Sequence, residues 1–294
     1  MEPSQAQSAR PSSRATAENY ELGVLNLTHD FGHVRRPEVA RVIWPVSSPR
    51  MSEKMTQRTV RRLLDRSQLT EIPNILGGLS LVLTKGGATR LREWGIDARH
   101  GCDMPSITGP QFYHRMLGTC YLIERQIRGH TAYGEHAIAR GRAPVRQGEL
   151  ERRFRKLPDG LVLVPGVERG FAHGGLVADW IEVESSRKPY QELRRILDVA
   201  WQVGVFIDDA RTIVLDRVVF VYNGRQGHEQ PILKALEQYI LAHRPDVPSV
   251  FLSGIALARC NIRTPLVWHG HEEIDGNTLL RAEASRGDSK GNPP

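Results

Sequence analysis

The sequence of 294 residues is poor in cysteine and has no long apolar run. Its three cysteines, Cys102, Cys120 and Cys260, stand far apart and outside any CxxC pair, so neither a disulfide framework nor a structural zinc site is expected. No stretch approaches the roughly 20 apolar residues of a membrane-spanning helix. Residues 1–18 lack the apolar segment of a secretory signal. These absences indicate a soluble protein of the reducing cytoplasm that does not associate with membranes.

A Walker A loop and a GxGxxG motif are also missing, so no nucleotide cofactor is expected. What the chain has instead is positive charge. The 40 Lys and Arg outnumber the 33 Asp and Glu, which gives a net charge of +7. Such an excess favours a polyanionic partner, because contacts to phosphates release condensed counterions. DNA is therefore the expected partner.

Changes in composition divide the chain into five parts. The two ends are polar and rich in Ser, Pro or Gly, which predicts disordered tails. Gly and Pro cluster between an Arg-rich helical region and a longer region in which apolar strands alternate with helices, and this cluster marks a linker. The expected parts are a tail (1–18), a DNA-binding domain (19–99), a linker (100–110), an α/β domain (111–275) and a tail (276–294).

The first domain has the element order of a winged helix. The pattern predicts helix, helix, strand, turn, strand and helix, with Ser52 and Thr84 as helix caps and with Leu91 and Trp94 in the core. The predicted elements cover residues 36–43, 56–69, 69–72, 74–78, 79–84 and 85–94. In a winged helix, the second or third helix enters the major groove and the wing touches the backbone.

The helix over 56–69 is expected to contact DNA. Residues 35–66 contain nine Lys and Arg against three acids, which favours DNA, although a solvated basic helix in a protein-interaction module would have a similar pattern. Side chains near the helix start can reach base edges, and those further on can neutralise phosphates. The expected base contacts are Gln57, Arg58 and Thr59, and the expected backbone contacts are Arg61, Arg62, Arg66 and Lys85.

The second domain carries a set of acids on two predicted strands. Asp159 opens the buried strand that follows Pro158, and Glu182 and Glu184 share one face of the next strand. Lys188 follows four residues later. Carboxylates are the ligands that Mg²⁺ prefers, and a bound metal polarises a phosphodiester while a lysine orients water or offsets charge. Alternation of Glu with aliphatic residues also occurs on the solvated side of an edge strand.

These motifs resemble the PD-(D/E)xK nuclease superfamily, and more narrowly the replication-relaxation family of plasmid and mobile-element proteins. The resemblance covers roughly residues 30–225. It lies in Leu157-Pro158-Asp159 followed by Trp180-Ile181-Glu182-Val183-Glu184-Ser185, and in the N-terminal run Leu81-Val82-Leu83-Thr84-Lys85-Gly86-Gly87. It implies a winged helix joined to a restriction-endonuclease-like mixed sheet flanked by helices.

The resemblance also implies roles for particular residues. Asp159 and Glu182 would bind Mg²⁺ or Mn²⁺, and Glu184 and Lys188 would complete the catalytic set. Glu184 stands where the family usually has lysine, so Lys188 would have to reach back. A further acid from a preceding helix would come from Glu135 or Glu149, between which the sequence does not choose.

Two functions remain open at the level of sequence. The first is a metal-dependent nickase or relaxase-like nuclease that acts in plasmid or mobile-element replication or mobilisation. The second is a catalytically inactive DNA-binding accessory protein or transcriptional regulator, in which the nuclease-like domain serves for homodimerisation or backbone contact. A relaxase-type metal pair at His269 and His271, with Tyr113, Tyr121 or Tyr133 as nucleophile, is disfavoured because Gly270 stands where such motifs have a bulky residue.

Overall fold

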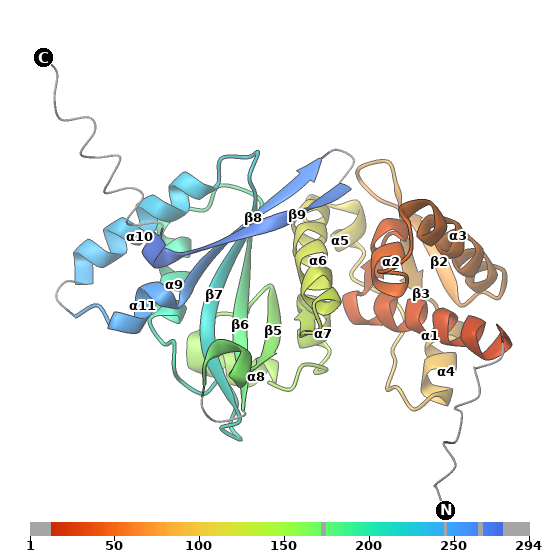
Figure 1. The fold of residues 1–294 in the computed structure, drawn as a ribbon, viewed down its shortest axis with the longest axis horizontal. Helices are drawn as coiled ribbons and strands as arrows, with labels where there is room; N and C mark the ends of the chain where they lie inside the picture. Colours follow the sequence, from red (N-terminus) through yellow and green to blue (C-terminus); the bar gives the residue numbers. More distant parts are fainter. Residues whose placement is uncertain (1–12, 172–174, 244–245, 264–266, 279–294) are drawn as a thin grey trace, which may run out of the picture. The chain divides into compact units, whose positions relative to one another are not determined.

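The computed structural model describes residues 13–171, 175–243, 246–263 and 267–278 (Figure 1). It divides the chain into two compact units at Cys102 and Asp103, except that the loop Pro73–Gly78 groups with the second unit. The boundary falls within the predicted linker. The mixed α/β class predicted from the sequence is confirmed, with one small and one larger sheet.

The first unit contains four helices and three short strands among its described residues. They are α1 (Ser13–Phe31), β1 (His33–Val34), α2 (Arg36–Ile43), α3 (Pro49–Asp65), β2 (Leu69–Pro73), β3 (Leu79–Leu83) and α4 (Lys85–Glu93). The strands form a sheet in the order β1-β3-β2, with β1 antiparallel to β3. The predicted elements are present, but α1 begins inside the segment that was predicted to be a disordered tail.

Local sequence accounts for the helix boundaries in this unit. Thr84 caps α4 as predicted, because its hydroxyl accepts a hydrogen bond from the Gly87 amide at 3.2 Å. The predicted cap at Ser52 is wrong, since α3 already begins at Pro49 after Ser48, and proline suits a first helical turn. Leu91 is buried as predicted, whereas Trp94 is 54% exposed and lies outside the core.

The second unit alternates helices with the strands of a larger sheet. Before the central strands come α5 (Pro105–Thr108), α6 (Phe112–Ile127), β4 (Thr131–Gly134), α7 (Glu135–Ala139) and α8 (Gln147–Phe154). Then follow β5 (Gly160–Pro165), η1 (Gly166–Arg169), β6 (Leu176–Glu184), α9 (Tyr190–Ala200) and β7 (Ile213–Asn223). The unit continues with α10 (Glu229–His243), α11 (Ser249–Ser253), β8 (Ile255–Arg263) and β9 (Val267–Asp275).

The six strands of this sheet follow one another in chain order, β4-β5-β6-β7-β8-β9. The pairs β4–β5, β5–β6 and β8–β9 are antiparallel, while β6–β7 and β7–β8 are parallel. Parallel neighbours need a crossover connection, and α9 and α10 supply these connections. The strand β6 therefore lies in the middle of the sheet, between an antiparallel and a parallel neighbour.

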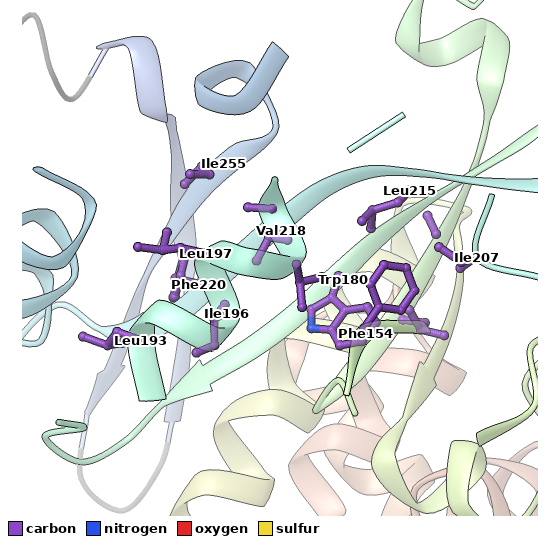
Figure 2. Close-up of a cluster of buried hydrophobic side chains, with 14 of the residues drawn as sticks. Phe154, Trp180, Leu193, Ile196, Leu197, Ile207, Leu215, Val218, Phe220 and Ile255 are labelled. Carbon is purple, nitrogen blue, oxygen red and sulfur yellow. The ribbon is translucent and has the colours of Figure 1, made fainter. Parts of the chain in front are cut away.

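Helices cover both faces of this sheet. On one face, α8, α9 and α10 pack over alternate residues of the strands, and Figure 2 shows the ring of Trp180 beside that of Phe154, at a centroid distance of 5.1 Å. Leu193, Ile196 and Leu197 of α9 extend this cluster along the sheet (Figure 2). The opposite face packs against α6. Because both faces are covered, the side chains of β6 are buried on both sides.

The segment that carries His269 and His271 lies in β9, near the C-terminal end of the described chain. The predicted tail begins after β9, and its residues 279–294 lie outside the described part of the chain. Within the described ranges, no helix combines the length and apolar character needed to cross a membrane.

Candidate functional site

The pairing of β5 with β6 places Asp159 beside Glu182. Asp159 directly precedes β5, its amide donates to the carbonyl of Ile181 at 2.9 Å, and its carboxylate accepts a hydrogen bond from the Val183 amide at 2.7 Å. These two bonds flank Glu182 in the neighbouring strand. Residues that are 23 positions apart therefore meet where β5 begins and β6 ends.

Glu182 and Glu184 share one face of β6, as the alternation predicts. The interpretation of this face as the solvated side of an edge strand is wrong. β6 is a central strand, and the relative exposure of the two residues is 0% and 2%. The indole nitrogen of Trp180 donates to Glu182 Oε1 at 2.7 Å. A buried carboxylate is costly unless it is paired and hydrogen-bonded, so these two acids require compensation.

Two lysines from different segments supply this compensation. Lys188, which lies between β6 and α9, reaches back so that its Nζ is 2.8 Å from Glu184 Oε1 and 3.9 Å from Glu182 Oε2. The resemblance implied this backward reach. Lys156, which follows α8, lies 2.9 Å from Glu182 Oε2 and was not among the expected site residues.

A histidine of α6 completes the cluster. His114 Nε2 lies 3.1 Å from Asp159 Oδ1, and its Nδ1 lies 3.2 Å from the hydroxyl of Ser185. The sequence analysis missed His114 because no spacing links it to residues 45 positions away. Its only signal was its place at the start of a helix that precedes the acidic strands.

The fold moves the pKa values of the acids apart. Burial raises the pKa of Asp159, but the bond to His114, the Val183 amide and Lys188 outweigh it and lower the pKa to about 2. Burial and the negative charge of Asp159 raise the pKa of Glu182 to about 7. Burial also raises the pKa of Glu184. Burial opposes the charge of Lys188, but Glu184 and Glu182 outweigh it and raise its pKa. Opposite shifts in neighbouring acids are typical of catalytic sites.

Neither acid proposed from a preceding helix joins the cluster. Glu135 pairs with Arg115, and Glu149 accepts a hydrogen bond from the Arg146 amide at the start of α8. Both carboxylates therefore have other partners. In this structure, the side chain that a preceding helix presents to Asp159 is His114.

The chemistry of these residues fits a hard divalent cation. Asp159, Glu182 and Glu184 offer carboxylate oxygens, which Mg²⁺ and Mn²⁺ prefer. Glu182 Oε2 is buried, and its partners are the ammonium groups of Lys156 at 2.9 Å and Lys188 at 3.9 Å. In the side-chain arrangement of the described residues, no three His, Cys, Asp or Glu side chains form a ready metal site. Cation binding would therefore require Lys156 or Lys188 to turn aside.

The two-histidine segment of β9 is engaged in packing. The side chain of His271 is 1% exposed, bonds to Glu273 at 3.2 Å and packs edge-on against Tyr121. Tyr121 donates its hydroxyl to Glu273, and burial raises the pKa of this phenol well above its usual value. Such a phenol is a poor nucleophile at neutral pH, so the geometry disfavours a relaxase-type tyrosine here.

The first unit presents a second candidate site on α3. One face of this helix is buried, and the opposite face is exposed and cationic. We call this exposed face the α3 stripe. Its members are Arg50, Lys54, Gln57, Arg58 and Arg61. Among the described residues, no ion-pair partner is found for Arg58 or Arg61, so their guanidinium groups are available to phosphates.

Three of the predicted DNA contacts have other surroundings. Thr59 is 1% exposed, so the prediction that it reaches base edges is wrong. Arg62 and Arg66 both form ion pairs with the buried Glu21 of α1 at 2.8 Å. Their positive charge is therefore partly offset within the fold. These arginines remain 40% and 54% exposed. Lys85 is exposed at the start of α4, as a backbone contact requires.

Comparison of the chain with protein-family models, with curated proteins and with solved structures finds no match.

Proposed function

We propose that this protein is a DNA-binding, metal-dependent phosphodiesterase that cuts a DNA backbone at the Asp159–Glu182 cluster. The observation that carries the proposal is the gathering of the buried Glu182 and Glu184 with the partly buried Asp159 and Lys188 at the meeting point of β5 and β6. A buried charged cluster of this kind stabilises a fold poorly, because desolvation offsets most of the attraction. Function is the simpler reason to keep it.

The topology around the cluster supports the same proposal. A helix, three antiparallel strands, a crossover helix and a parallel strand (α6, β4, β5, β6, α9 and β7) come in the order expected of a restriction-endonuclease-like core, with α7 and α8 inserted between β4 and β5. The acids lie at the edge where the parallel strands β6 and β7 end. Open α/β sheets bind ligands outside the carboxyl ends of their strands.

Several side chains of the cluster can contribute to hydrolysis of a phosphodiester. A divalent cation bound at the carboxylates would polarise the phosphodiester and acidify a water molecule. A carboxylate of the cluster can accept the proton of the attacking water. The water oxygen forms a new bond to phosphorus, one ester P–O bond breaks, and the departing oxygen gains a proton. Lys188 keeps its positive charge, which offsets the charge that builds up on the phosphate.

The first unit would deliver the DNA. Its element order and its sheet order β1-β3-β2 support a winged helix, in which α3 would be the recognition helix. The cationic α3 stripe lies on the solvent side of that helix. We therefore assign base and backbone contacts to Gln57, Arg58 and Arg61, with Lys85 as a further backbone contact.

One observation favours the alternative of a non-cleaving accessory protein. Lys156 and Lys188 already pair with Glu182 and Glu184, and His114 lies 3.1 Å from Asp159, so each carboxylate has a partner without a cation. In that case the cluster would position α6 and α9 for backbone contact or dimerisation. The two functions differ in one measurable property, which is cleavage of DNA.

The test is incubation of the purified full chain with supercoiled plasmid and Mg²⁺ or Mn²⁺. We expect relaxed or linear product from the unaltered protein, and a loss of at least about 100-fold in rate for Asp159→Ala and for Glu182→Gln, as is typical when a group that stabilises the transition state is removed. Glu182→Gln keeps the shape of the side chain, so misfolding does not account for its loss.

A matched control comes from the exposed Glu151 of α8. The variant Glu151→Ala, purified in the same way, should cleave like the unaltered protein. Cleavage that survives in both site variants, or no cleavage with either metal, would overturn the enzyme proposal and favour the accessory protein.

A further inference from the structure

Two surface hollows beside the acidic cluster share two arginines. The first has a volume of about 210 Å³ and is lined by Arg155, Lys156, Lys188, Glu192, Arg195 and Ile196. The second has a volume of about 630 Å³ and is lined by Arg153, Phe154, Arg155, Arg195, Asp198 and Gln202. Since Arg155 and Arg195 belong to both linings, the hollows adjoin one another along the end of α8 and the outer side of α9. We call the two hollows together the α8–α9 trough.

The trough is lined by five cations and two acids, and two of the five cations are not paired within the described part of the fold. Arg155 and Arg195 are exposed, and neither has an ion-pair partner among the residues that the structure describes. Of the two acids in the lining, Asp198 accepts a hydrogen bond from the hydroxyl of Tyr239 at 2.8 Å. Glu192 is exposed in the first turn of α9. Cations therefore outnumber acids along the whole trough.

The inner end of the trough reaches the acidic cluster. Lys156 and Lys188 line the smaller hollow, and the same two ammonium groups lie 2.9 Å from Glu182 and 2.8 Å from Glu184. A ligand seated in the trough would therefore extend toward the carboxylates. One end of the trough therefore lies beside the acidic cluster.

The backbone at Arg155 provides independent evidence. Arg155 ends α8 with φ 52° and ψ 24°, in the left-handed region. Helices usually place glycine or asparagine at such a position, because a Cβ is disfavoured there. Residues kept in this conformation against their preference cluster at binding sites. An arginine at this position makes the fold less stable than a glycine would. Its side chain lines both hollows.

We propose that the α8–α9 trough binds the phosphodiester backbone of a nucleic acid strand, next to the stretch that lies at the acidic cluster. The proposal rests on the proposed function and adds the path of the strand. An extended trough with arginines along it matches a ligand with repeated negative charges better than a single phosphate ion. Arginine also suits phosphate by its planar, paired donors.

The experiment measures binding of a labelled single-stranded oligonucleotide to the full chain. All variants carry Arg58→Ala and Arg61→Ala, so that the α3 stripe contributes little. In this background, Arg155→Gly with Arg195→Ala should weaken binding about tenfold and reduce the slope of log affinity against log salt by about 1.4, since each lost contact to a single strand removes about 0.7. The control Arg194→Ala removes an exposed arginine of α9 that lines neither hollow and should change neither quantity.

Stability separates lost contacts from lost folding. Arg155→Gly relieves the left-handed backbone, so its melting temperature should equal or exceed that of its parent while binding falls. Equal affinity and equal salt slope in the double variant and in Arg194→Ala would overturn the trough. If no DNA is cleaved but the trough variants lose binding, the enzyme proposal fails and the trough stands. If cleavage occurs and the trough variants bind and cleave normally, the trough fails alone.

Discussion

At the scale of single residues, the environments of Asp159 and Glu182 differ although the two side chains are neighbours. Asp159 receives hydrogen bonds from the Val183 amide and from His114, which favour its charged form. Glu182 is fully buried beside that negative charge, which favours its neutral form. Ionisation of Asp159 therefore stabilises the fold, whereas ionisation of Glu182 destabilises it.

The variants Glu182→Gln and Asp159→Asn should consequently change stability in opposite directions. The folded pKa of Glu182 is about 7, above its ordinary value of 4.5, so its ionisation costs stability as pH rises through that window. The folded pKa of Asp159 is about 2, below its ordinary value of 3.8. The ionised carboxylate of Asp159 therefore stabilises the fold fully above pH 3.8, and this stabilisation is lost as the pH falls through about 2. At about pH 8, Glu182→Gln should stabilise and Asp159→Asn destabilise, each by on the order of 2 kcal/mol.

Amide hydrogen exchange in β5 and β6 measures these changes locally, which avoids assuming that both units unfold together. The gain for Glu182→Gln should vanish at about pH 4, where the unfolded and folded states both hold the proton. A Glu182→Gln protein that exchanges faster than its parent at high pH would contradict the pKa assignment.

At the scale of elements, the close approach of α6 to β6 brings His114 to Asp159. Gly118 stands in the middle of α6, and a Cβ at this position would meet Val183 Cγ2 at 3.1 Å. The helix thus lies closer to the sheet than a larger residue allows. This separation also sets the His114–Asp159 distance of 3.1 Å.

The substitution Gly118→Val should therefore affect both packing and the site. Overpacking of this kind costs about 1–3 kcal/mol, which hydrogen exchange in α6 and β6 can measure. Displacing His114 should lower the cleavage rate by about tenfold or more, since small misplacements of catalytic groups are costly.

A glycine of α8 provides the control. Nothing lies within 4 Å of a Cβ built at Gly148, so Gly148→Ala should stabilise the helix by about 0.5–1 kcal/mol and leave cleavage unchanged. If Gly118→Val packs and cleaves like the unaltered protein, α6 does not position the site.

At the scale of the whole molecule, the net charge of +7 includes both cations that are paired within the fold and cations that are not. The α3 stripe of the first unit and the α8–α9 trough of the second each carry arginines for which the described residues offer no ion-pair partner. Other arginines form ion pairs within the fold, as Arg62 and Arg66 do with Glu21. Net charge alone therefore overstates the number of cations that are available to DNA.

Duplex binding should depend on the α3 stripe more than on total charge. Arg58→Ala with Arg61→Ala should weaken binding of a DNA duplex at least tenfold and reduce its salt slope by about 1.8, since each phosphate contact contributes about 0.9. The variant Arg92→Ala with Arg99→Ala removes the same charge from exposed positions outside α3. Equal losses in both pairs would mean that binding follows net charge and that α3 has no special role.

Features that depend on residues close together in the sequence were predicted correctly, and features that depend on distant residues were not. The cap at Thr84 and the alternation in β6 were predicted because each depends on residues within a few positions. The exposure of Trp94 and the burial of Thr59 were not, because the periodicity of a helix shows which residues share a face but not which neighbours cover it. The pairing of Arg62 with Glu21 was equally hidden, because it joins two helices through residues 41 positions apart.

The sequence by itself determined most of the elements between residues 36 and 94, the excess of positive charge, and the placement of Asp159 before one strand and of Glu182 and Glu184 on the next, because these follow from local alternation, turns and composition. Only the tertiary structure decided that Glu182 and Glu184 are buried, that Lys156 and Lys188 pair with them, and that His114 and not a helix acid reaches Asp159. Those partners come from α6 and from the segments that follow α8 and precede α9. They meet only because the strands pair in one register and helices cover both faces of the sheet.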